Sequence, residues 1–95
     1  MERNSLFLMA NLGSEVSRLL SFREKGDMAE VEKSYKRSKH IIDQIIDCPE
    51  MKSRYTEVSM LREVIEDLSI SEKKYSVYSE DLQNYFTPFA VRLLR

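Results

Sequence analysis

The stretch from Asp27 to Cys48, DMAEVEKSYKRSKHIIDQIIDC, has the clearest helical pattern in the chain. Its apolar residues recur at steps of three, four and seven, which places them on one face of a helix. Paired isoleucines break the alternation that a half-buried strand needs. Asp27 is expected as the N-cap, with Glu30 completing a variant of the capping box, and Pro49 ends the helix. The stripe consists of Met28, Val31, Tyr35, Ser38, Ile42 and Ile45, widened by Ile41 and Ile46.

A second helix is expected before this one, from Asn4 or Ser5, either of which can cap it, to about Lys25. Gly13 lies inside it and costs about 1 kcal/mol relative to alanine. This glycine either admits a closely approaching helix or is simply tolerated. The connection over residues 26–27 is short enough to make the two helices an antiparallel hairpin. The expected stripe is Met9, Leu12, Val16, Leu19 and Phe22, flanked by Leu8 and Leu20.

A third helix is expected after Pro49, because proline suits the first turn of a helix. Polar residues 72–78 are expected to form coil. The fourth helix opens with Ser79 as N-cap, and Pro88 inside it removes a hydrogen bond and should kink or split it. The inner face of the third helix is expected to hold Met51, Tyr55, Val58, Leu61, Ile65 and Leu68, with Val64 beside them, whereas Arg54, Glu57, Arg62, Glu63 and Glu66 face outward.

These helices predict an all-α protein with a single domain over residues 1–95, an antiparallel four-helix bundle whose fourth helix is kinked near Pro88. An up-down-up-down order follows from the short connections. The alternative is three packed helices, with the fourth docked across them or exchanged with a partner subunit. Two glycines and two prolines leave few places for turns, which favours long helices over many short strands.

Composition excludes several classes of protein. Hydrophobic residues make up 42% of the chain, which is too many for a disordered protein, and the net charge of −1 gives no overall attraction to nucleic acid or anionic membranes. A single cysteine, Cys48, excludes an internal disulfide. The apolar run over residues 6–10 is too short for a signal peptide or a membrane span. We therefore expect a cytoplasmic protein that does not associate with membranes.

Both ends of the sequence carry apolar residues on more than one helical face. One small bundle offers each helix a limited inward arc, so part of this surface is expected to contact another molecule. The simplest arrangement is a two-fold homodimer, and a different protein partner is the competing version. A broad helix fully buried in a monomer is the alternative. The expected partner-binding residues are Phe7, Phe86, Phe89, Val91 and Leu94.

A group of basic residues lies on the helix over residues 27–48. Such a face could contact phosphates, but interspersed carboxylates dilute its field and no aromatic residues interleave to stack on bases. A solvated helix face is the more common explanation. The possible nucleic-acid contacts are Lys33, Lys36, Arg37, Lys39 and His40.

No motif in the sequence carries recognisable chemistry. His40, Asp43 and Asp47 follow at steps of three and four and could form half of a metal site, but no second histidine exists to complete it. Cys48 lies beside a proline at a helix end, which favours an idle thiol over a nucleophile. We therefore predict no catalytic residue, no cofactor and no metal.

The segments MANLGSEVSRLL (9–20) and SYKRSKHIIDQII (34–46), joined through a tight turn in a chain of this size, resemble the compact helical domains of the HEPN group. HEPN ribonucleases carry an arginine and a histidine separated by four to six residues. Here only two residues separate Arg37 from His40, and the required positions hold Lys33, Ser34 and Tyr35. The resemblance therefore implies a non-catalytic member, of the kind that binds small nucleotidyltransferases, and it transfers no functional residue.

The leading hypothesis from the sequence is a non-enzymatic helical module that works through protein association, either with itself or as a subunit of a small complex. The alternative is a HEPN-like RNA-binding or RNA-processing module that uses Arg37 and His40.

Overall fold

The structure is a computed structural model that describes residues 2–70 and 79–93. It contains α1 (Arg3–Lys25), α2 (Met28–Ile46), the short 3-10 helix η1 (Pro49–Arg54), α3 (Tyr55–Leu68) and α4 (Ser79–Leu93). The expected coil over residues 72–78, the expected capping side chain of Ser79 and the expected contact residue Leu94 lie outside the described residues.

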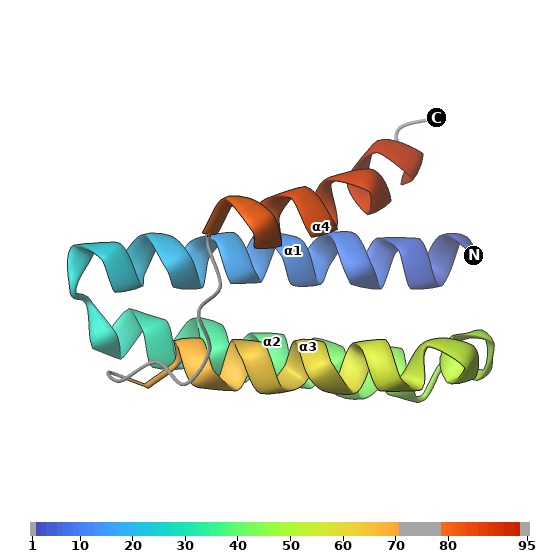
Figure 1. Ribbon diagram of the computed structural model, residues 1–95, viewed down its shortest axis with the longest axis horizontal. Coiled ribbons are helices and arrows are strands. Elements are labelled where there is room, and N and C mark those ends of the chain that lie inside the picture. The colour runs from blue at the N-terminus through green and yellow to red at the C-terminus, as the bar shows by residue number, and fades with distance from the viewer. Residues whose placement is uncertain (1, 71–78, 94–95) are drawn as a thin grey trace.

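The four α-helices form the predicted bundle and run in alternating directions (Figure 1). α1 is the central element, because both α2 and α4 pack along it, while α3 packs mainly against α2. Pro88 lies inside α4, which continues to Leu93 rather than splitting. The last turns of α4 lean away from α1 in the view of Figure 1.

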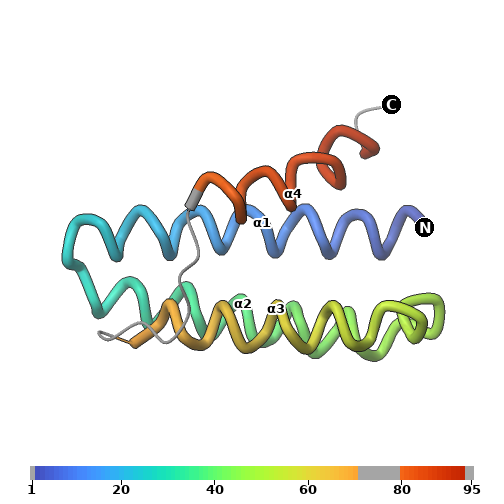
Figure 2. Tube along the Cα trace, viewed as in Figure 1, coloured from blue at the N-terminus to red at the C-terminus, as the bar shows by residue number. Residues whose placement is uncertain are grey.

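The turn between α1 and α2 forms as the sequence predicts (Figure 2). Gly26 adopts the left-handed conformation at φ 78°, which glycine enters without steric cost. Its N–H donates to the carbonyl of Arg23 at 3.0 Å, and the N–H of Asp27 donates to Phe22 at 2.9 Å. The Asp27 carboxylate in turn accepts from the N–H of Glu30 at 3.3 Å, so the expected N-cap is present.

The hydrophobic core follows the predicted stripes of α1 and α2 except at Met28, which was expected on the inner face and is 39% exposed at the first position of α2. Met9, Leu12, Val16 and Leu19 from α1 are almost fully buried in the core, and Ser34 and Ser38 are buried with the apolar residues of α2. The Ser38 hydroxyl donates to the carbonyl of Ser34 at 2.8 Å, which satisfies one of these buried polar groups. The core is completed by Leu8, Leu20, Val31, Ile41, Ile42, Ile45, Met51, Val58, Leu61, Ile65, Leu68, Leu82, Phe86 and Phe89.

The start of α1 differs from the prediction. The helix begins at Arg3, and neither Asn4 nor Ser5 caps it. Ser5 is buried and its hydroxyl donates to the Glu50 carboxylate, which also accepts from the N–H of Glu2 at 2.8 Å. Ser5 therefore links α1 to η1 instead of capping the start of its own helix.

The segment after Pro49 is the second correction. It forms η1, with α3 starting only at Tyr55. A 3-10 helix has about 3.0 residues per turn instead of about 3.6, so four residues rotate the chain further than they do in an α-helix. Met51 stays buried, whereas Tyr55 turns outward and is 58% exposed. Its predicted place on the inner face was therefore wrong.

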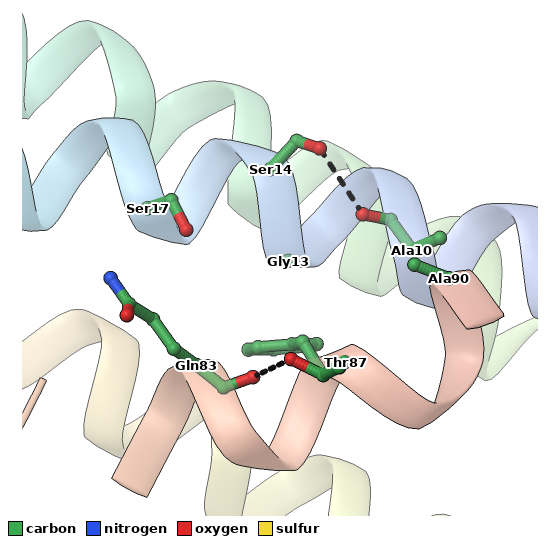
Figure 3. Close-up of a pocket in the computed structure, with 8 residues that line it drawn as sticks. Ala10, Gly13, Ser14, Ser17, Gln83, Thr87 and Ala90 are labelled. Carbon is green, nitrogen blue, oxygen red and sulfur yellow. Dashed lines mark hydrogen bonds between the residues drawn. The ribbon is translucent and has the colours of Figure 1, made fainter. Parts of the chain in front are cut away.

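Gly13 marks a close approach of α4 to α1. A Cβ atom at this position would lie 2.7 Å from Cβ of Phe86 and 2.8 Å from its Cγ, so only glycine fits. Figure 3 shows Gly13 among the small residues Ala10, Ser14 and Ser17 of α1, facing α4. The sequence left two explanations for this glycine, and the structure supports the close approach of another helix.

Arg23 joins the end of α1 to the end of α3. Its Nη1 donates to the carbonyl of Leu68 at 2.6 Å and also to the carbonyl of Ile70. Leu68 is the last residue of α3 and Ile70 lies two residues beyond it. Carbonyl groups at a helix C-terminus lack partners within the helix and favour positive charge.

We expect Arg23→Ala to lower the free energy of unfolding by about 1–2 kcal/mol, because two carbonyls lose a charged donor. Arg23→Lys keeps the charge but not the forked donor, so its loss should be intermediate. Urea denaturation of the three proteins measures the difference, and equal midpoints for wild type and Arg23→Ala would contradict this role.

Candidate protein-interaction site

An apolar groove opens between α3 and α4. Its volume is about 480 Å³, and its lining is almost entirely apolar. Leu61 and Leu82 are buried residues in this lining, whereas Met60 stands 62% exposed. The remaining residues that line it are Thr56, Glu57, Val64, Asp81 and Tyr85.

The groove exists because α4 packs on α1 and makes few contacts with α3. α3 packs mainly against α2. A hydrogen bond joins α3 to α4, where the Tyr85 hydroxyl donates to Glu57 Oε2 at 3.0 Å. The two helices are thus connected near the start of α3, and the groove lies along them as an open trough.

Tyr85 belongs to a small aromatic cluster on α4. Its ring meets that of Phe86 edge-on at 5.0 Å between centroids and that of Phe89 at 5.7 Å. Arg54 lies over the Phe89 ring at 5.9 Å from its centroid. Burial raises the pKa of the Tyr85 hydroxyl well above its ordinary value, and the hydrogen bond to Glu57 adds to the rise. Tyr85 therefore stays protonated and keeps donating to Glu57 at neutral pH.

The raised pKa predicts a loss of stability in alkali. Tyrosine ionises near pH 10 in the unfolded chain but later in the folded one, so the contribution of Tyr85 is complete below about pH 10 and declines above it. We expect Tyr85→Phe to flatten the fall of the unfolding free energy above pH 10. Burial also raises the pKa of Tyr35, so Tyr35→Phe should add to the flattening. An unchanged alkaline slope in Tyr85→Phe would contradict the Tyr85–Glu57 link.

The predicted partner-binding residues divide into two groups. Phe86 and Phe89 are each only 6% exposed, because α4 turns them into the core of the subunit. This corrects the expectation that the aromatic residues of α4 exceed what one subunit can bury. Phe7 and Val91 remain on the surface, 58% and 45% exposed. They lie at the end of the bundle where α1 begins and α4 ends (Figure 1).

The basic residues of α2 are mostly engaged with neighbouring carboxylates. Lys33 lies 3.2 Å from Glu30, and Lys36 lies 3.4 Å from Glu32. Lys39 and His40 are exposed. A hollow of about 480 Å³ beside them brings Lys36, Arg37 and His40 together with Asn11, Glu15, Ile41 and Gln44.

Arg37 has a structural role that its sequence position does not reveal. The Glu15 carboxylate of α1 is buried and accepts from Arg37 Nε at 2.9 Å and from Arg18 Nη1 at 2.6 Å. Arg37 also donates to the Ser34 hydroxyl at 3.2 Å. Two of the polar residues in the hollow therefore form a neutralised ion pair rather than an open cationic surface.

The remaining chemical features of the sequence do not gather into a site. Within residues 2–70 and 79–93, no cluster of three histidine, cysteine, aspartate or glutamate side chains is arranged to hold a metal. Asp43, one member of the possible metal half-site, accepts from Arg62 at 2.6 Å. Cys48 is half-buried, and its thiol faces the carbonyl of Gln44 at 3.4 Å. None of the helices in the described part of the chain has the length and hydropathy to cross a bilayer.

Sequence reasoning missed the groove because its lining looked like ordinary helix surface or core. Val64 was expected beside the buried stripe of the third helix, and Met60 was assigned to neither its inner nor its outer face. The one available signal was Met60 itself, a large apolar residue outside the stripe of its helix.

Comparisons of the chain with protein-family models, curated proteins and solved structures found no match.

Proposed function

We propose that this protein is a non-enzymatic interaction module that binds another polypeptide through the groove between α3 and α4. It then acts as a subunit of a small complex or as a self-associating protein. The single observation that carries the proposal is the exposure of Met60 at the edge of an apolar trough within an otherwise well-packed bundle. Open apolar surfaces of this kind mark interaction sites in soluble proteins.

The form of the groove supports a polypeptide over a small molecule. Sites for small ligands usually enclose most of the ligand surface. This trough is open along its length and runs between two helices, so it contacts an occupant from one side only. A helix that lays one apolar face into a groove satisfies that geometry.

Site-specific photo-crosslinking in the cells that produce the protein tests this function. A benzophenone side chain at position 60 should give a discrete covalent adduct with a polypeptide, either a second copy or another protein. The same group at position 28, another exposed methionine, serves as the matched control. Absence of an adduct at position 60, or equal adducts at both positions, would contradict the proposal.

The hollow beside α2 supports the second candidate, RNA binding by a HEPN-like module. It gathers Lys36 and His40 one helical turn apart. Salt-dependent RNA binding that Lys36→Ala and Lys39→Ala abolish would favour this candidate. Arg37 is unsuited to the test because its substitution also disturbs Glu15. Lack of RNA binding at low salt removes the candidate.

A further inference from the structure

The groove between α3 and α4 is bordered by negative charge. Glu57 and Asp81 are part of its lining, one from each helix. Exposed Glu80 and Asp81 fill the first turn of α4. Elsewhere on α3, Asp67 is buried and Glu66 lies close enough to Tyr35 of α2 to act on it, so the negative border of the trough consists of Glu57 and the start of α4.

The cations near the groove in the described part of the chain offset this negative charge only in part. Arg62, the one basic residue of α3, donates to Asp43 at 2.6 Å and is thereby directed toward α2. Arg54 lies 3.8 Å from Glu57 but is also placed over the Phe89 ring, at one end of the groove. Asp81, at the start of α4, is exposed to solvent. Arg54 therefore offsets part of the charge of Glu57, and exposed Asp81 is the carboxylate that a positively charged partner meets first.

We propose that the occupant of this groove is an amphipathic helix of another protein, with an apolar stripe flanked by lysine or arginine residues. This inference rests on the proposed interaction function and specifies its partner. Apolar side chains one turn apart would enter the trough beside Met60 and Val64, while the flanking cations approach Glu57 and Asp81. Charge complementarity sets the orientation and the rate of association, and like charges brought together at the rim cost affinity.

A second copy of this chain does not offer such a helix. The described α-helices with an excess of positive charge are α1 and α2, and their apolar stripes pack against each other. Either helix could present its stripe to a neighbour only by leaving its own bundle. The partner helix must therefore come from a different polypeptide.

A designed peptide tests the inference directly. The probe is a fluorescent peptide on the order of 18 residues, about five helical turns, with a leucine stripe flanked by lysines. Its control has glutamate in place of every lysine. We expect the lysine peptide to bind at least about tenfold more tightly than the glutamate peptide in anisotropy titrations, a difference of about 1.4 kcal/mol. We also expect its binding to weaken with salt.

Three substitutions test whether the lysine peptide binds in the groove. Met60→Glu should weaken binding of the lysine peptide by about tenfold or more. Asp81→Lys should weaken it several-fold and reduce its salt dependence, because a rim charge is reversed. Met28→Glu, the same substitution at an exposed methionine at the other end of the bundle, should leave the affinity unchanged.

Four outcomes overturn the inference. They are equal binding of the two peptides, equal effects of Met60→Glu and Met28→Glu, no binding of the lysine peptide up to about 1 mM, and a dimer in sedimentation that Met60→Glu dissolves. If position 60 still crosslinks to a polypeptide in cells, the interaction function stands and only the partner's chemistry is wrong. If position 60 does not crosslink either, both proposals fail.

Discussion

Gly13→Leu should destabilise the protein by about 3 kcal/mol or more, because the new side chain occupies the place of Phe86. A Cβ atom alone would approach Phe86 Cβ to 2.7 Å, and that atom is fixed to the α4 backbone. α4 must therefore move off α1, which exposes Leu82, Phe86 and Phe89 to water at about 2 kcal/mol each. The better helix propensity of leucine offsets only about 1 kcal/mol.

Ser21→Leu provides the matched control for this prediction. It introduces the same residue on the same helix, but at an exposed position. We expect its unfolding free energy to stay within about 0.5 kcal/mol of wild type. Urea denaturation measures both variants. If Gly13→Leu is as stable as Ser21→Leu, α4 does not pack on α1 at this point.

The second large effect is expected at Glu15. Its carboxylate is only 7% exposed, and Arg18 and Arg37 compensate its charge. The double variant Arg18→Ala/Arg37→Ala leaves the buried Glu15 charge without a partner. We expect it to lower the free energy of unfolding by about 3 kcal/mol, the usual cost of removing one side of a buried ion pair. Both arginines are about half exposed, so they return to water at little cost when Glu15 itself is removed.

A triple variant that adds Glu15→Ala separates the effect of the buried Glu15 charge from the effect of losing the packing of the two arginine side chains. We expect it to regain most of the stability lost in the double variant, because no buried charge remains. Thermal unfolding of wild type, double and triple variants at neutral pH gives the comparison. Equal stability of the double and triple variants would show that the uncompensated carboxylate is not the cause.

The sequence predicted the α1–α2 hairpin well because local rules agree there. Gly26 needs a left-handed turn, Asp27 caps the next helix, and the apolar spacing of both helices matches their buried faces apart from Met28. For Gly13, the sequence left two explanations open, the close approach of another helix or a tolerated interior glycine. Only the approach of Phe86, a residue far away in the sequence, decides between them.

The 3-10 segment and the groove could not be derived in the same way. Proline at position 49 suits the first turn of either helix type, so the outward turn of Tyr55 had no local signal. The burial of Phe86 and Phe89 and the exposure of Met60 depend on where α4 lies relative to α1 and α3. That placement results from tertiary packing, which helical periodicity does not specify.

Methionine oxidation tests the open groove most directly. Peroxide converts exposed methionine to its sulfoxide, and mass spectrometry follows each site. Met60 and Met28 should react quickly, whereas Met9 and Met51, at 0% and 3% exposure, should be protected. Addition of the lysine peptide should then protect Met60 but not Met28. Protection of Met60 in the isolated, monomeric protein to the level of Met9 would contradict the account, because the trough would already be filled.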